Sequence, residues 1–170
     1  MILTPGSILI SNTTMHGDPT FDRAVIIVAE HNEKGALGFI INKPFHRKFN
    51  ELVEFKNSIA FPLWMGGPVK KEELFFLHQR PDLVANGKPV TGNVYFGGNF
   101  QQAVQYMNDK TLKGNDVKLF IGYCGWDDHE LEDEIAEGTW IPVDTPLQTV
   151  FSTDTEYLWT LLYQSLKVPS

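Results

Sequence analysis

Cysteine is almost absent from this sequence, because Cys124 is the only one in 170 residues. A single cysteine excludes an internal disulfide and a thiolate metal cluster built within one chain. The sequence also lacks an apolar run long enough to cross a bilayer. Its first residues, MILTPGSILISN, have neither the basic start nor the long apolar segment of a signal peptide. These absences predict a cytoplasmic protein with no membrane partner.

Positive charge is also scarce. Fourteen Lys and Arg residues face 21 Asp and Glu residues, which gives a net charge of -7. Such a chain repels nucleic-acid phosphates at long range. Basic residues cluster only at Lys43, Arg47 and Lys48 and at the pair Lys70 and Lys71. Neither cluster is interleaved with aromatic residues on a recognition helix, so we do not expect direct nucleic-acid binding.

Complete catalytic motifs, internal repeats and linkers are missing as well. No serine occupies a nucleophile elbow, and no glycine-rich run has the form of a P-loop or a dinucleotide-binding fingerprint. His129 and Asp133 lie four residues apart, like the two histidines of a zinc-protease helix, but the second histidine and a third ligand are missing. We therefore expect one domain over residues 1–170, with no metal site and no cofactor.

Two apolar runs near the N-terminus predict strands that are buried on both faces. AVIIVAE (24–30) and ALGFIIN (36–42) are nearly continuous in apolar residues, and residues 31–35 form a turn between them. A helix is expected over residues 100–108 with Asn99 as its cap, and another after a capping box of Thr153 and Glu156. Other segments predicted to be extended are 7–11, 74–78, 94–96, 117–123, 139–143 and 146–151. Strands outnumber helices without strict alternation, so the fold class is α+β with a mixed sheet.

Residues 117–143, VKLFIGYCGWDDHELEDEIAEGTWIPV, are the stretch around which the chain is organised. The apolar run predicts a strand up to Tyr123, followed by a tight corner at Cys124 and then a helix capped by Asp127. Cys124 at such a corner fits either a buried structural residue or a reactive thiol. Seven of the eleven residues 127–137 are acidic, more than helix stability requires. This acidic face is either simply solvated or a docking surface for a basic partner or a cation.

The motifs of the chain resemble those of the AlgH/YqgE family along nearly its whole length. In chain order, the matching pieces are Asp18-Pro19-x-Phe21-x-Arg23, Glu30-His31, Gly35-Ala36-x-Gly38, Ile41-Asn42-Lys43-Pro44, Gly66-Gly67-Pro68-Val69, Phe76-Leu77-His78, Gly122-Tyr123-x-Gly125-Trp126, and Leu131-Glu132-x-Glu134-Ile135 followed by Trp140. Each piece alone is common, but their joint order and spacing are specific.

This resemblance implies a single compact α+β domain whose mixed sheet is partly closed into a small barrel with flanking helices. The family is largely uncharacterised, and its name comes from a proposed role in regulating alginate production, which implies a transcriptional regulator. We do not carry over DNA binding, because the chain has no helix-turn-helix pattern and no basic surface. One departure is His129-Glu130, where the family usually has Gly-Gln. The charge presented at that corner therefore differs here.

Polar and turn residues on the scaffold of buried strands define the candidate binding surface. Its members are His16, Asp18, Arg23, Glu30, His31, Asn42, Lys43, Gly122, Tyr123 and Trp126. No complete catalytic set is evident, so we expect a non-enzymatic regulatory or binding protein that takes a small anionic ligand or a protein partner. The alternative is a hydrolase that uses His31 together with Glu30 or Asp18.

Overall fold

A nine-stranded sheet and three helices make up the structure, a computed structural model that describes residues 2–166. The strands are β1 (Ile8–Ser11), β2 (Val25–Asn32), β3 (Gly35–Ile40), β4 (Leu63–Met65), β5 (Val69–His78), β6 (Lys88–Thr91), β7 (Val94–Phe96), β8 (Val117–Asp127) and β9 (Trp140–Val143). The helices are α1 (Phe100–Asn108), α2 (Glu130–Ala136) and α3 (Leu158–Ser165), with 3-10 turns η1 (Thr13–Met15), η2 (Phe49–Glu51), η3 (Val53–Phe55) and η4 (Leu147–Phe151). The α+β class predicted from the sequence is confirmed.

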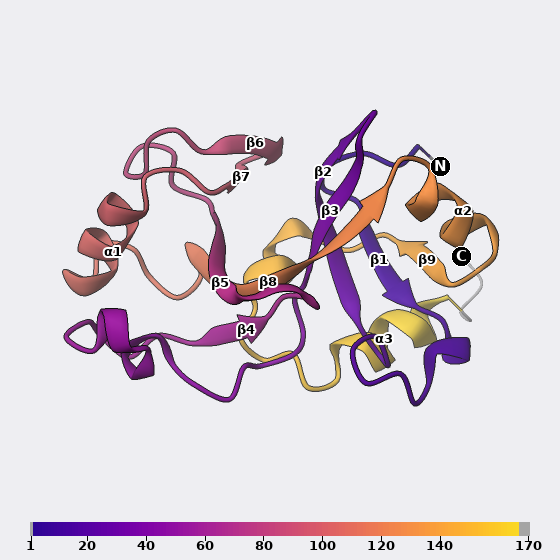
Figure 1. Cartoon of the computed structure of the whole chain (residues 1–170), viewed down its shortest axis with the longest axis horizontal. Helices are drawn as coiled ribbons and strands as arrows, with labels where there is room; N and C mark the ends of the chain where they lie inside the picture. The colour runs from indigo at the N-terminus through magenta and orange to yellow at the C-terminus, as the bar shows by residue number, and fades with distance from the viewer. Residues whose placement is uncertain (1, 167–170) are drawn as a thin grey trace.

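Strand β8 joins the two halves of the molecule, as Figure 1 shows. The strand order is β6-β7-β5-β8-β3-β2-β1-β9, and β4 pairs with β8 outside this path. The first part of β8 pairs with β5 and, in parallel, with β4, whereas its last residues pair with β3. All other strand pairs are antiparallel. Gly122, with φ of 76°, lies where β8 passes from one set of partners to the other.

Three glycines allow residues 66–67 to pass very close to the backbone of β8 beside this point, which we call the backbone crossing. A Cβ built on Gly67 would lie 2.1 Å from the carbonyl carbon of Tyr123, and one on Gly66 would lie 2.4 Å from the carbonyl oxygen of Gly122. A Cβ on Gly122 would in turn lie 2.4 Å from the carbonyl oxygen of Gly67. Since real Cβ atoms do not approach other atoms so closely, any side chain at these positions forces the two segments apart. Two of the sequence motifs therefore have a packing explanation.

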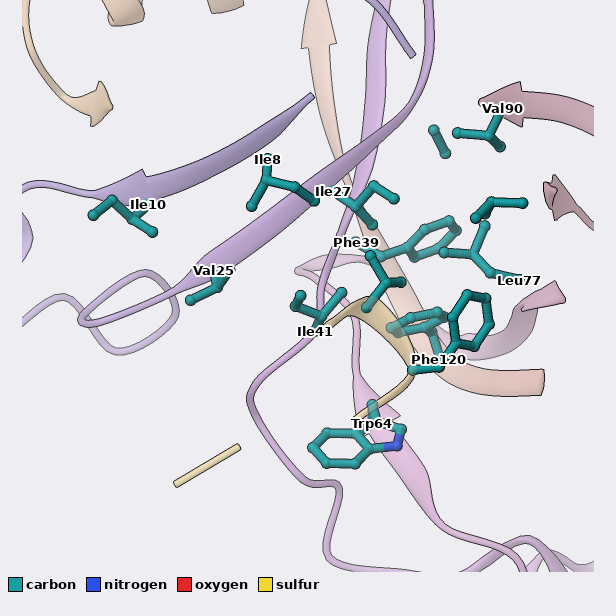
Figure 2. Packing of buried hydrophobic residues seen from close by; sticks show 14 of the residues in the cluster. Ile8, Ile10, Val25, Ile27, Phe39, Ile41, Trp64, Leu77, Val90 and Phe120 are labelled. Carbon is teal, nitrogen blue, oxygen red and sulfur yellow. The ribbon is translucent and has the colours of Figure 1, made fainter. Parts of the chain in front are cut away.

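The strands β1, β2 and β3 are buried on both faces, as their continuous apolar runs predict. On one face, the side chains join a core beneath α3 and η4; Figure 2 shows Ile8, Ile10, Val25, Ile27, Phe39 and Phe120 in this cluster. On the other face, the alternate residues Leu9, Ile26 and Ile40 pack with Leu131 of α2 and with Trp126 and Trp140. A third cluster lies between β8 and α1. Helix α2 thus covers the opposite face of the sheet from α3.

The expected partial barrel is wrong, because the sheet stays open. Among the described residues, the end strands β6 and β9 have no pairing with one another. Each of these end strands contains a proline, Pro89 in β6 and Pro142 in β9. Proline lacks an N–H and is tolerated on edge strands, where it also discourages further pairing. The sheet bends at Gly122 of β8 instead of closing on itself.

Four local predictions also need correction. The strand does not end at Tyr123, because residues 35–38 of β3 pair with 124–127 and extend β8 through Asp127. Helix α2 consequently follows His129, whose φ is 66° and whose side chain makes no capping bond. Residues 147–151 form η4 instead of an extended segment, and α3 begins at Leu158 without the predicted capping box. The Asn99 cap of α1 is confirmed, since its side chain accepts a bond from the Gln102 amide.

Candidate functional site

Five of the predicted surface residues lie close together around the turn before β2: His16, Asp18, Arg23, Asn42 and Lys43. Together with Asp22, which bonds to His16, we call them the Arg23 corner. His16 Nδ1 lies 2.7 Å from Asp22 Oδ1, and this hydrogen bond is the main reason that the pKa of Asp22 is lowered. Arg23 has φ of 50° and its guanidinium lies 3.6 Å from Asp22. The Asn42 side chain donates to the Arg23 carbonyl and accepts from the Val25 amide, so it clamps this strained bend.

The remaining members of the Arg23 corner fix the neighbouring loop. Asp18 Oδ1 accepts hydrogen bonds from the amides of Thr20 and Phe21, at 2.9 and 2.8 Å. Lys43 Nζ donates to the Thr20 carbonyl at 2.9 Å, and burial lowers the pKa of its ammonium group. The cations of this corner therefore face acceptors from the chain itself. The result is a loop held by side-chain hydrogen bonds, which places the Phe21 ring against Trp140 of β9.

Glu30 and His31 lie at the opposite end of β2 from the Arg23 corner. Glu30 accepts from Lys88 Nζ at 3.1 Å, and His31 Nε2 lies 3.4 Å from Glu132 Oε2 of α2. The hydrolase interpretation pairs His31 with Glu30 or Asp18, but its carboxylate partner in the structure is Glu132. The structure thus divides the ten predicted residues between separate places.

The other three predicted residues belong to β8. Gly122 forms the backbone crossing, and the Tyr123 ring packs edge-on against Phe75 at 5.3 Å between ring centroids. Trp126 is largely buried, and its Nε1 donates to Glu134 Oε1 at 3.1 Å. Trp126 also lines a cavity, which Gly122 and Tyr123 do not.

This cavity, of about 240 Å³, lies between the end of β8, helix α2 and the loop before β2. Residues from four of the quoted motifs, together with Trp140, meet on its walls: Phe21, Pro68, Val69, Gly125, Trp126, Glu134 and Trp140. Met15, Cys124, Glu130 and Thr139 complete the lining. We call this hollow the motif cavity. Because segments far apart in the sequence converge here, it is the candidate functional site.

Three aromatic rings form one corner of the motif cavity. The Trp140 ring is nearly perpendicular to both of its neighbours, at 88° to Phe21 and 88° to Trp126, with centroids 5.4 and 6.2 Å away. Both indole N–H groups donate to the same oxygen of Glu134, at 3.1 Å from Trp126 and 2.9 Å from Trp140. One carboxylate therefore fixes the planes of two tryptophans, and it places a negative charge beside the rings.

Cys124 faces the motif cavity from β8 but is enclosed. Its side chain is buried, and Sγ donates to the Gly66 carbonyl at 3.4 Å. Burial raises the pKa of the thiol far above its ordinary value, which suppresses the reactive thiolate. Of the two interpretations drawn from the sequence, the buried structural cysteine agrees with this geometry.

The acidic segment 127–137 forms one rim of the motif cavity through Glu130 and Glu134. Its recorded ion pairs involve only histidines, His31 and His129. Within residues 2–166, none of its seven carboxylates forms an ion pair with Lys or Arg. Nor do three His, Cys, Asp or Glu side chains gather there, or elsewhere in that range, as metal ligands would. The segment is thus an uncompensated negative surface.

The candidate surface drawn from the sequence leaves out Phe21, Glu134 and Trp140, although all three belong to the quoted motifs, and Glu134 enters only as one residue of the acidic face. Their only signal was the presence of aromatic residues and one glutamate at fixed places in separate motifs. What could not be seen was that β8 continues to Asp127 and so brings α2 over the same face as Trp140. No helix of the described chain has the length and apolar character needed to cross a membrane.

Known proteins match this chain along nearly its whole length. A family profile described as AlgH-like matches residues 8–170. A UPF0301 protein of Chlorobaculum tepidum is 37% identical over 158 residues, covering 93% of this chain and 84% of the relative. A UPF0301 protein of Cytophaga hutchinsonii is 33% identical over 166 residues, covering 97% and 91%.

Solved structures show the same fold. The solution structure of the AlgH protein from Pseudomonas aeruginosa has a TM-score of 0.77 at 24% identity, over 99% of this chain and 94% of that one. The crystal structure of a protein from Corynebacterium diphtheriae has a TM-score of 0.78 at 18% identity, over 99% and 89%. Since the profile spans almost the entire sequence and the relatives above exceed 30% identity across it, the chain belongs to the AlgH-like family.

Proposed function

We propose that this chain is a regulatory binding protein that recognises its ligand at the motif cavity and performs no chemistry on it. The observation that carries the proposal is the convergence of Phe21, Pro68, Gly125, Glu134 and Trp140 on one hollow. Close packing of glycines explains part of two of these motifs, but it does not explain why side chains from all four motifs and Trp140 line one hollow. Cavities with apolar walls and a few fixed polar groups are the usual form of a ligand site.

The chemistry of the lining supports binding more than turnover. The nucleophile nearest the hollow is Cys124, and its raised pKa and burial keep it as a neutral thiol. Glu134 accepts two indole N–H bonds, so one of its oxygens is committed to holding the rings. An acid or base that works in catalysis must be able to reach a proton of the substrate. The rings and carboxylates instead form a preorganised recognition surface.

The Arg23 corner has a supporting role in this proposal. Asp18, Asn42 and Lys43 bond to the backbone of the loop that carries Met15 and Phe21 to the motif cavity. A rigid loop lowers the entropy cost of ordering the site when a ligand binds. A regulatory role would then follow from a ligand-dependent change at α2, which lines the other side of the hollow. The small anionic ligand expected from the sequence stays a prediction for the Arg23 corner itself.

A cavity-filling variant tests the proposal. Thermal unfolding is measured with a panel of small amines, guanidines, neutral aromatics and carboxylates, since a ligand that binds only the folded state raises its stability. Met15→Trp places a large ring at a lining position, whereas Thr14→Trp changes the adjacent, exposed residue that does not line the hollow. We expect at least one compound to stabilise the wild type and Thr14→Trp equally, with the shift lost in Met15→Trp.

Two results would contradict the proposal. The first is a panel with no stabilising compound, or a stabilising compound that still acts on Met15→Trp. The second is chemical conversion of the bound compound, which is checked by recovering it after incubation and measuring its mass. Recovery of the unchanged compound agrees with a binding role.

A further inference from the structure

We propose that the motif cavity binds an organic cation, either an alkylammonium or a guanidinium head group. This inference rests on the proposed function, because it names the ligand class of the same site. It joins three independent features of the hollow: the arrangement of its rings, the sign of its charge and its size.

The aromatic corner has the geometry of a cation site. Trp140 stands perpendicular to both Phe21 and Trp126, and all three rings line the motif cavity. A ring face attracts a cation that lies within about 6 Å of its centroid, and tryptophan is the strongest of the aromatic side chains in this respect. The same chain already uses such a contact, since Lys118 Nζ lies 3.9 Å from the centroid of the Trp64 ring.

The charge at the motif cavity has the matching sign. Glu130 and Glu134 line the hollow, and Glu134 Oε1 faces the two indole N–H groups. The other acidic residues of 127–137 surround this rim, and within the described part of the chain no Lys or Arg neutralises them. Such a surface attracts cations and repels a carboxylate or a phosphate. It therefore selects between ligands of equal size by their charge.

Size restricts the ligand to a head group. The motif cavity measures about 240 Å³, which is below the range of roughly 300–1,000 Å³ typical of pockets that enclose a whole drug-sized ligand. A trimethylammonium or guanidinium group fits such a space while the rest of its carrier stays outside. The carrier is either a small metabolite or the basic side chain of a partner protein, and the experiment below separates the two.

Indole signals in 1H–15N NMR spectra report binding directly, because the chain has four tryptophans. Trp126 and Trp140 line the motif cavity, whereas Trp64 and Trp159 do not and serve as internal controls. The probes are choline, methylguanidinium, the tripeptides Gly-Lys-Gly and Gly-Arg-Gly, and 3,3-dimethylbutan-1-ol, the neutral isostere of choline. We expect one or more of the cations to shift only the Trp126 and Trp140 signals. The neutral isostere should bind about tenfold more weakly than choline.

Matched charge variants sharpen this test. Glu134→Gln keeps an oxygen that accepts both indole N–H bonds but removes the charge, and Glu130→Gln removes the second lining charge from an exposed position. Each should weaken cation binding by about tenfold, a usual coupling for close charge pairs. Glu137→Gln makes the same change in net charge on the same segment, away from the hollow, and should change affinity by less than about twofold at physiological salt.

The outcomes separate this inference from the proposed function. If the neutral isostere binds as tightly as choline, or Glu134→Gln keeps full affinity, the cation inference is overturned while the cavity stays a ligand site. If no probe moves the Trp126 and Trp140 signals at millimolar concentration, the cation inference is likewise overturned, and the broader panel with Met15→Trp decides the proposed function separately. A tripeptide that binds more tightly than choline supports the inference and identifies a basic protein segment as the carrier.

Discussion

Each half of β8 takes part in a contact between a charged side chain and tryptophan, with opposite signs of charge and different surroundings: the first half contributes Lys118, and the second contributes Trp126. Before the Gly122 bend, the ammonium group of Lys118 lies over the Trp64 ring face at 3.9 Å and donates to the carbonyls of Ile41 and Ser152. After the bend, Glu134 accepts from the ring edges of Trp126 and Trp140. A ring face attracts a cation and an indole N–H donates to an anion, so both arrangements are favourable.

What differs is access. Lys118 is only 3% exposed and does not line the motif cavity, so its ammonium group contacts only interior groups of the fold. Glu134 is less buried and borders a hollow with room for a head group. A buried charge beside a tryptophan therefore does not by itself identify a functional site. The adjacent cavity is the feature that distinguishes the two halves.

The largest expected effect comes from the close backbone approach of Gly66 and Gly67 to Gly122 and Tyr123 of β8. In Gly67→Ala, the new methyl carbon would lie 2.1 Å from the Tyr123 carbonyl carbon, and backbone on both sides must move. We expect a loss of several kcal/mol in the free energy of unfolding, in the range of the most disruptive substitutions. Urea denaturation followed by tryptophan fluorescence measures it.

Gly125→Ala is the matched control, because it also adds one methyl group near the motif cavity. Its nearest neighbour would be a Tyr123 ring atom at 3.4 Å, an ordinary contact with a movable side chain. We expect a change below about 1 kcal/mol. Equal losses from the two variants would show that the crossing tolerates a side chain at Gly67 as well as β8 tolerates one at Gly125.

The sequence predicted the strands whose burial is a local property. The runs 24–30 and 36–42 are apolar at nearly every position, and the structure pairs them as β2 and β3. The end of β8 was mispredicted because Gly122, Cys124 and Gly125 are typical of a turn. Only pairing with β3, which is almost 90 residues earlier, makes this segment a strand. Long-range contacts of that kind leave no periodic signal in the segment itself.

The candidate site was harder to predict for the same reason. Trp126 was placed on the candidate surface from its motif, and it does line the motif cavity. For the acidic face that contains Glu134, the sequence allows either simple solvation or a docking surface for a basic partner or a cation. It does not predict the contact with the two rings, because the indole N–H groups that Glu134 binds come from two other segments. Gly122 and His31 also belong to quoted motifs, but neither lines the motif cavity. Gly122 takes part in the backbone crossing, and His31 contacts Glu132. A motif shows which positions matter, and only the fold shows why.

Stability should depend on pH through Lys118. Burial lowers the pKa of its ammonium group to about 7, although the Trp64 face and the two carbonyls favour the charged form. Between about pH 7 and the ordinary pKa of 10.5, the unfolded chain holds a proton that the folded chain has released. The unfolded state then binds more protons, so this contribution to stability rises with pH in that window, by up to about 1.4 kcal/mol per pH unit, and is lost as pH falls toward 7.

Lys118→Met isolates this contribution, because methionine fills a similar space and keeps a contact with the Trp64 ring without titrating. Urea denaturation of both proteins is measured at pH 7 and pH 9 at equal ionic strength. We expect the wild type to gain stability relative to Lys118→Met between the two pH values. A difference between the proteins that is the same at pH 7 and pH 9 would show that Lys118 stays protonated throughout.

The smallest expected effect is at Glu134, and it tests whether this side chain holds the rings as an acceptor or as a charge. Glu134→Gln retains an oxygen for both indole N–H groups, so the free energy of unfolding should change by less than about 0.5 kcal/mol. Glu134→Leu leaves two largely buried N–H groups without that acceptor and should cost about 1–3 kcal/mol. If Gln destabilises as much as Leu, the negative charge itself holds the rings in place. If Gln is tolerated, the charge contributes little to folding, and a charge retained at a cavity without a folding role is available for a cationic ligand.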